Sequence, residues 1–130
     1  MEYKHNNTSV IMVNYHIVFC PKYRRKLLVG DVKKRLSEIF DGVAKDNNWE
    51  IIAKEIMPDH VHLFVYADVL TRPEIVVKRF KGRSSNFLRK EFPELLKMPT
   101  LWTRSYFLST AGNVSSATIK GYINRQWDKV

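Results

Sequence analysis

The predicted strand Val61–Val69 and the residue before it alternate strictly between two kinds of side chain. The aliphatic positions are Val61, Leu63, Val65 and Ala67. The histidine and aromatic positions between them are His60, His62, Phe64 and Tyr66. Because successive side chains of a strand point to opposite faces of a sheet, one face of this strand is expected to be buried and the other open. The segment therefore predicts a sheet that helices cover on one side.

Five further segments carry strand or helix patterns. Strands are predicted at Val10–Cys20, Trp49–Met57 and Leu101–Thr110, and helices from Asp31 to about Asp46 and from Pro73 to about Glu91. In chain order these elements form the split βαβ, ferredoxin-like arrangement, an antiparallel α+β sheet with both helices on one face. A last helix, from Ser115 or Ser116 to about Trp127, is expected to cover the open face. Residues 1–130 are expected to form a single domain.

The helices have predicted caps and buried faces. Asp31 is expected to cap the first helix, and Asn47 and Asn48 to close it. Its buried stripe is predicted at Leu36, Ile39, Phe40 and Val43. The second helix is predicted to bury Val76, Phe80, Ser84 and Phe87. Both helices would then pack against the aliphatic face of the sheet.

Composition limits the partners and the compartment. The chain has 22 Lys plus Arg against 13 Asp plus Glu, a formal net charge of +9, which favours a polyanion such as nucleic acid, although the charge alone is also consistent with mere solubility. The longest apolar run, Leu63–Ala67, is far below the roughly 20 residues of a membrane span. The N-terminus is polar without a signal peptide, so a cytoplasmic location is expected. The single cysteine, Cys20, excludes an intrachain disulfide.

Three histidines are predicted on the open face. His60 and His62 lie side by side, and neutral imidazole is the commonest side-chain ligand of metal ions, so the pair predicts a two-ligand site that needs a third ligand. The alternative is a polar, half-exposed strand face. His16, on a neighbouring strand, is predicted either as an ordinary exposed histidine or as a contact of this site or of a phosphate.

The last predicted helix carries Tyr122 and Gln126 on one face, one turn apart. A tyrosine hydroxyl has a pKa of about 10 and needs a metal ion or a base to act as a nucleophile. The amide oxygen of Gln126 is a hard donor that would complete a metal site with His60 and His62, and Tyr122 would then reach a phosphate bound to the same ion. The alternative is that Tyr122 only packs.

Several ordered motifs together resemble one known family. They are Tyr15–Arg25 (YHIVFCPKYRR), Met57–Leu63 (MPDHVHL), Phe80–Ser85 (FKGRSS), Leu101–Phe107 (LWTRSYF), Gly112–Ser115 (GNVS) and Ile119–Gln126 (IKGYINRQ). This set is similar to the single-tyrosine transposases of the HUH endonuclease superfamily, which move small insertion sequences as single-stranded DNA. The resemblance covers nearly the whole chain, and the family's histidine pair and downstream Tyr-x-x-x-Gln are both present.

The resemblance implies a mechanism and a partner. Tyr122 would be the nucleophile that forms a 5′-phosphotyrosine link, and His60, His62 and Gln126 would hold a divalent metal, Mg2+ or Mn2+ in this family. Ligand softness alone would favour zinc. The family also implies binding to DNA hairpins at the element ends and a homodimer in which the tyrosine helix of one subunit serves the histidines of the other. The base that takes the Tyr122 proton is not identified.

A group of basic residues is predicted to contact DNA phosphates. By charge and placement they are Lys22, Arg24, Arg25, Arg79, Lys81, Arg83 and Arg104. Three other functions compete with the transposase hypothesis: a non-catalytic RRM-like module that stacks bases on Phe64 and Tyr66, a zinc hydrolase built on the histidine pair, and a replication-initiating relative of the same superfamily. Covalent capture of cleaved DNA separates the first from the transposase, and hydrolysis that survives Tyr122→Phe would indicate the second.

Overall fold

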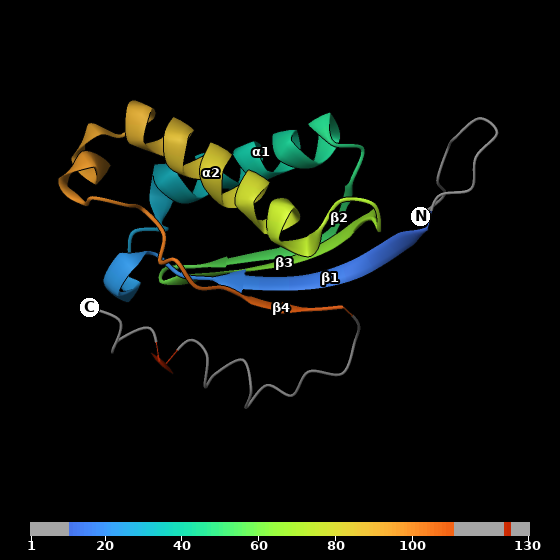
Figure 1. The fold of residues 1–130 in the computed structure, drawn as a ribbon. Coiled ribbons are helices and arrows are strands. Elements are labelled where there is room, and N and C mark those ends of the chain that lie inside the picture. Colours follow the sequence, from blue (N-terminus) through green and yellow to red (C-terminus); the bar gives the residue numbers. More distant parts are fainter. Residues whose placement is uncertain (1–10, 111–123, 126–130) are drawn as a thin grey trace.

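The computed structural model describes residues 11–110 and 124–125. Its sheet consists of β1 (Met12–Phe19), β2 (Glu50–Met57), β3 (His60–Asp68) and β4 (Phe107–Ser109), in the order β2-β3-β1-β4. Every neighbouring pair is antiparallel. The helices α1 (Gly30–Asp46) and α2 (Pro73–Glu91) lie together on one side of the sheet (Figure 1). The predicted α+β arrangement is confirmed.

The core fills the space between the helices and the sheet. The aliphatic residues of β3 that face it, Val61, Leu63, Val65 and Ala67, are all fully buried. The predicted stripe of α1 is buried as well, with Phe40 packed edge-on against both Phe19 and Phe80. Burial of such apolar faces is the main force that holds the helices on the sheet. The strict alternation of β3 thus decides which face of the sheet carries helices.

Short 3-10 turns connect the larger elements. One covers Lys22–Arg24, after β1, and another covers Pro93–Lys97, after α2. β2 is an edge strand, and its pairing with β3 shifts register between Ile51 and Ala53, which is the mark of a β-bulge. In the described part of the chain, no helix is long and apolar enough to cross a membrane.

The predicted fourth strand, Leu101–Thr110, is much too long. Only Phe107–Ser109 pair with β1, opposite Val18, Ile17 and His16. Upstream of them, Trp102 forms an isolated antiparallel bridge with Pro21, and the backbone N–H of Thr103 donates to Cys20 O. Between this bridge and β4, the Lys81 ammonium of α2 donates to the carbonyl oxygens of residues 103–105. The predicted strand is therefore interrupted before Phe107, which no pattern within residues 101–110 reveals.

Two details of the helices also differ from the predictions. Asp31 does not cap α1, because the helix begins one residue earlier, at Gly30, and no side chain caps it. Phe87 is 37% exposed, whereas Val77 and Leu88 of α2 are buried in its place. The buried stripe of α2 lies slightly around the helix from the predicted one. Asn47 does close α1 as expected, and Asn48 adopts a positive φ of 57°.

The predicted C-terminal helix falls almost entirely outside the described residues, as do Tyr122 and Gln126. Asn124 and Arg125 are described, and both are helical and exposed. The expectation that this helix covers the open face stays a prediction.

Candidate active site

His60 and His62 begin β3 and lie on the sheet face opposite the helices. Their ring centroids are 5.0 Å apart and their planes are nearly perpendicular. The register of β1 against β3 places Val18 opposite His62 and His16 opposite Phe64, so His16 is the diagonal neighbour of His62. The pair predicted from alternation is therefore joined by the third histidine.

His16 and His62 share a hydrogen bond. His16 Nε2 lies 3.2 Å from His62 Nδ1, and the His16 ring stacks on Phe64 with centroids 4.1 Å apart. Burial lowers the pKa of His16. The prediction that His16 is an ordinary exposed histidine is wrong, because the ring is half-buried and holds a second histidine in place.

Asp59 orients His60. Its Oδ1 lies 2.8 Å from His60 Nδ1, and its Oδ2 is held by the Arg24 guanidinium. Burial acts to raise the pKa of Asp59, but the hydrogen bonds from His60 and Arg24 outweigh it, and the net pKa is lowered. Asp59 is therefore an anion at neutral pH. A carboxylate on one ring nitrogen is the usual arrangement behind a histidine that binds a metal ion through the other nitrogen.

The histidine pair fits a metal ion. In both rings Nδ1 is engaged, by Asp59 in His60 and by His16 in His62, so that among the residues the structure describes Nε2 of each ring is left for a ligand. Burial, with the neighbouring His60 and His16, lowers the pKa of His62 to about 4, so that its ring is neutral at pH 7, as coordination requires. Within the described residues, no group of three His, Cys, Asp or Glu could hold a metal ion, so a third ligand must come from elsewhere in the chain or be of another kind.

Arg24 lies beside this site. Its Nε and Nη2 are 2.9 and 2.7 Å from Asp59 Oδ2, and its Nη1 is 3.3 Å from Asn124 Oδ1. In the structure its guanidinium contacts Asp59 and Asn124, and the predicted phosphate contact of Arg24 stays a prediction.

Two of the predicted phosphate contacts flank Tyr23 in the same loop. Lys22 Nζ and the Arg25 guanidinium carbon each lie 5.5 Å from the Tyr23 ring centroid. The backbone N–H of Lys22 donates to Leu101 O at 2.8 Å, which holds this loop against the segment that contains the exposed Arg104. Because β1 ends where β3 begins, these cations gather at the end of the sheet that carries His60.

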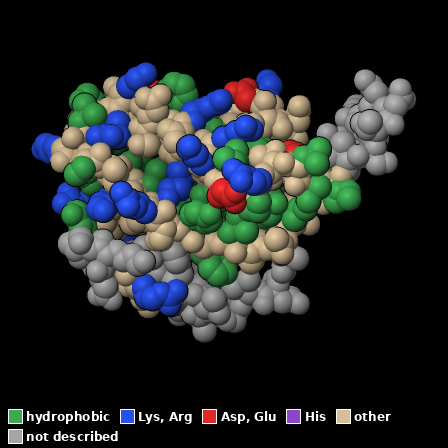
Figure 2. Space-filling model, viewed as in Figure 1, with side chains coloured by type: hydrophobic (Ala, Val, Ile, Leu, Met, Phe, Trp, Pro, Cys, Tyr) green, Lys and Arg blue, Asp and Glu red, His purple; other side chains and the backbone are tan. Residues whose placement is uncertain are grey.

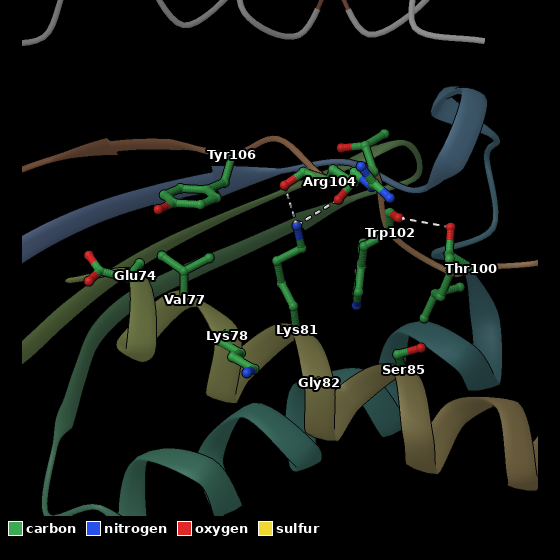
Figure 3. Close-up of a pocket in the computed structure, with 12 residues that line it drawn as sticks. Glu74, Val77, Lys78, Lys81, Gly82, Ser85, Thr100, Trp102, Arg104 and Tyr106 are labelled. Carbon is green, nitrogen blue, oxygen red and sulfur yellow. Dashed lines mark hydrogen bonds between the residues drawn. The ribbon is translucent and has the colours of Figure 1, made fainter. Parts of the chain in front are cut away.

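The remaining three predicted contacts lie elsewhere. Arg79 and Arg83 extend from α2 to the end of α1, where they bond Asn47 Oδ1 and Asp46 Oδ2, each at 2.5 Å. Lys81 points into a cavity of about 390 Å³ between α2 and residues 100–106 (Figure 3). Its Nζ donates to Thr103 O at 2.6 Å, and burial lowers its pKa to about 8. Lys81 thus holds the chain that leads into β4.

Comparison with known proteins places the chain in a family. The family described as "Transposase IS200 like" matches residues 9–126. The chain belongs to the IS200-like transposase family. It is 36% identical to the ISDra2 transposase TnpA of Deinococcus radiodurans, over 99% of this chain and 94% of that protein. It is 31% identical to the transposase for insertion sequence element IS200 of Salmonella typhimurium, over 88% of this chain and 77% of that protein.

Solved structures agree with this membership. A Deinococcus radiodurans crystal structure assigned as a transposase superposes with a TM-score of 0.83 at 33% identity, covering 97% of this chain and 98% of that one. A REP-associated tyrosine transposase bound to a REP hairpin shares the fold, with a TM-score of 0.56 at 13% identity, covering 98% of this chain and 72% of that one. The resemblance to the single-tyrosine HUH transposases is confirmed.

Sequence reasoning missed one residue of this IS200-like transposase site and one pairing. Asp59 was not among the predicted site residues, and Arg24 was predicted to contact phosphate, with no link to Asp59. A usable signal for Asp59 is its place directly before His60, since a carboxylate next to a metal-binding histidine commonly orients it. Nothing in the sequence pairs Arg24 with Asp59, which lies 35 positions away.

Proposed function

We propose that this transposase binds the hairpin ends of an insertion sequence and cleaves and rejoins single-stranded DNA through a 5′-phosphotyrosine intermediate. The observation that carries the proposal is the pair His60 and His62, each with Nε2 left for a ligand, beside a loop of cations. Membership of a transposase family implies DNA cleavage and strand transfer. The proposed catalytic unit is one domain that spans residues 1–130.

His60, His62 and Gln126 would hold a divalent ion, Mg2+ or Mn2+. Such an ion supplies Lewis-acid polarisation of the scissile phosphate. The chain's own part is to present two imidazoles in fixed orientations, which Asp59 secures for His60 and His16 for His62. A fixed orientation spares the site the entropy cost of arranging its ligands.

Tyr122 would supply the nucleophile. Its phenolate oxygen attacks the phosphorus in line, an O–P bond forms, and the 3′-oxygen leaves and takes up a proton. The chain is then joined to the 5′-phosphate, and one phosphodiester replaces another, so no water or ATP is consumed. The reverse attack by a 3′-hydroxyl rejoins the strand.

The DNA partner follows from charge and family. The net charge of +9 suits a folded polyanion, and the relative of the same fold whose structure is bound to a REP hairpin supports a hairpin ligand. Lys22, Arg25 and Arg104 are the proposed phosphate contacts nearest the histidines. Arg79, Arg83 and Lys81 are proposed contacts only where the DNA extends over α2.

The test is covalent capture. The protein is incubated with labelled single-stranded DNA from the flank of its own gene, which carries a subterminal hairpin, together with Mn2+. A labelled adduct on a denaturing gel that disappears with Tyr122→Phe and with chelator supports the proposal. Tight hairpin binding without an adduct favours the RRM-like module, and hydrolysis that survives Tyr122→Phe favours a zinc hydrolase.

A homodimer with shared active sites is also proposed, on the resemblance. Mixing a Tyr122→Phe chain with a His60→Ala chain tests it, since one intact composite site forms in the mixed dimer and adduct formation should recover. If each subunit uses its own tyrosine, the mixture stays inactive.

A further inference from the structure

The Arg24 guanidinium connects two parts of the site that are far apart in sequence. One edge of the group, Nε and Nη2, contacts Asp59 Oδ2, and Nη1 contacts Asn124 Oδ1. Because a guanidinium is planar and rigid, a movement of one contact is transmitted to the other. Asp59 in turn fixes the His60 ring through its other oxygen.

The contact with Asp59 is protected and built into the backbone. The Arg24 and Asp59 side chains are only 16% and 11% exposed. Tyr23 and Arg24 both adopt left-handed conformations, with φ of 61° and 52°, although neither is glycine. Such conformations cost free energy and persist where the surrounding structure enforces them, commonly at functional sites. Here the strained turn brings the Arg24 side chain to the start of β3.

We propose that Arg24 is a positioning residue. It fixes the orientation of the His60 ring through Asp59, and it holds residues 124–125 near Asp59 through its contact with Asn124. This rests on the proposed function, because Asn124 stands in sequence between Tyr122, the proposed nucleophile, and Gln126, the proposed third ligand. In the proposed homodimer with shared sites, Arg24 would then fix the histidines of one site and, in the same chain, the helix that serves the other site. Phosphate contact is not its main role, since Asp59 and Asn124 occupy the guanidinium.

The first test replaces Arg24 with lysine, which keeps the charge but has no fork to contact two groups. We expect the affinity for Mn2+, measured by electron paramagnetic resonance without DNA, to fall by about tenfold or more. Adduct formation should fall by a similar factor, while hairpin affinity stays unchanged. The matched control is Lys34→Gln, which removes an exposed cation on α1 and should alter neither Mn2+ affinity nor cleavage.

The second test addresses the Asn124 contact, which is exposed, so that its variants do not threaten the fold. Asn124→Ala should slow adduct formation, whereas Asn124→Asp keeps an oxygen acceptor for Arg24 and should restore it. The double variant Arg24→Lys with Asn124→Ala should form adduct no more slowly than Arg24→Lys alone, because the two residues act through one contact.

Three results would overturn the inference: wild-type Mn2+ affinity in a folded Arg24→Lys protein, multiplicative effects in the double variant, or a loss of hairpin binding as large as the loss of cleavage. Failure of the proposed function has a different signature. If the proposed function is wrong, the wild-type protein itself forms no adduct. The Mn2+ affinity of Arg24→Lys then still tests whether Arg24 positions His60.

Discussion

Asp59 uses both carboxylate oxygens, one toward His60 and one toward Arg24. Protonation of this carboxylate at low pH should therefore lower the stability of the fold. Its pKa is lowered in the folded protein. A group of this kind contributes stability above its unfolded pKa of about 3.9, and the contribution is lost as the pH falls through the lower folded value.

We therefore predict that Asp59→Asn lowers the free energy of unfolding at pH 7 by about 2 kcal/mol, because it leaves Arg24 without its anion. The difference from wild type should shrink as the pH falls below about 4. Urea unfolding of both proteins between pH 7 and pH 3 measures it. A difference that stays constant down to pH 3 would show that the ionised carboxylate is not what stabilises the fold.

His62 predicts a loss of stability in the same direction, but at higher pH than Asp59. Its pKa is about 4 in the folded protein against about 6.5 in an unfolded chain, so the unfolded chain binds the extra proton between these values. Stability is then lost as the pH falls from about 6.5 to about 4. In chelator, the wild type should lose more stability over this range than His62→Asn. Parallel stability profiles would contradict the lowered pKa.

At the scale of elements, Lys81 ties α2 to the chain that leads into β4. Its ammonium donates to the carbonyls of residues 103–105, and its Nζ also lies 5.8 Å from the ring centroids of Phe19 and Tyr106. β4 has only three residues, so we expect it to rely in part on this tether for its place beside His16.

We predict that Lys81→Met lowers the free energy of unfolding by about 1–3 kcal/mol and speeds amide exchange in Phe107–Ser109. Hydrogen exchange read by mass spectrometry or NMR measures the local effect. Lys78→Met, at an exposed position that lines the same cavity, is the matched control and should leave exchange in β4 unchanged. Equal amide-exchange rates in Phe107–Ser109 of both variants would show that Lys81 does not hold β4 in place.

The elements differ in how far the sequence predicts them. α1, α2 and β3 lie within one or two residues of the predicted bounds, because each has a long periodic pattern that its own residues satisfy. The fourth strand was predicted too long because its pairing is interrupted before Phe107, in the segment whose carbonyls bind Lys81 of α2. The histidine pair was found from alternation alone, but Asp59 and Arg24 meet only through a turn with two left-handed residues, which no periodicity signals.

At the scale of the whole molecule, some Lys and Arg side chains form ion pairs with carboxylates and others do not. Figure 2 shows a face on which Lys and Arg side chains far outnumber Asp and Glu. In the helical layer, Arg35 and Arg83 are paired with Glu91 and Asp46. At the end of the sheet near His60, Lys22 and Arg25 contact the ring of Tyr23 instead. This end is expected to dominate the electrostatic attraction for DNA.

We predict that hairpin affinity falls steeply with added salt, and that Arg25→Gln or Arg104→Gln each lowers the slope of log K against log salt by about 1. Fluorescence anisotropy over a salt series measures it. Lys34→Gln on α1 removes the same single positive charge, but in the helical layer, and it should leave the slope unchanged. If all three variants shift the slope equally, the attraction is a property of net charge alone.

The bulge between Ile51 and Ala53 has a consequence for the protein's behaviour in a crowded cell. An outer strand with a regular row of free N–H and C=O groups is a template on which further copies add without limit. In this protein the irregular spacing of β2 interrupts one outer row, and the other outer strand offers only three residues. Open-ended polymerisation through the sheet margins is thereby discouraged, and assembly is left to surfaces of finite extent.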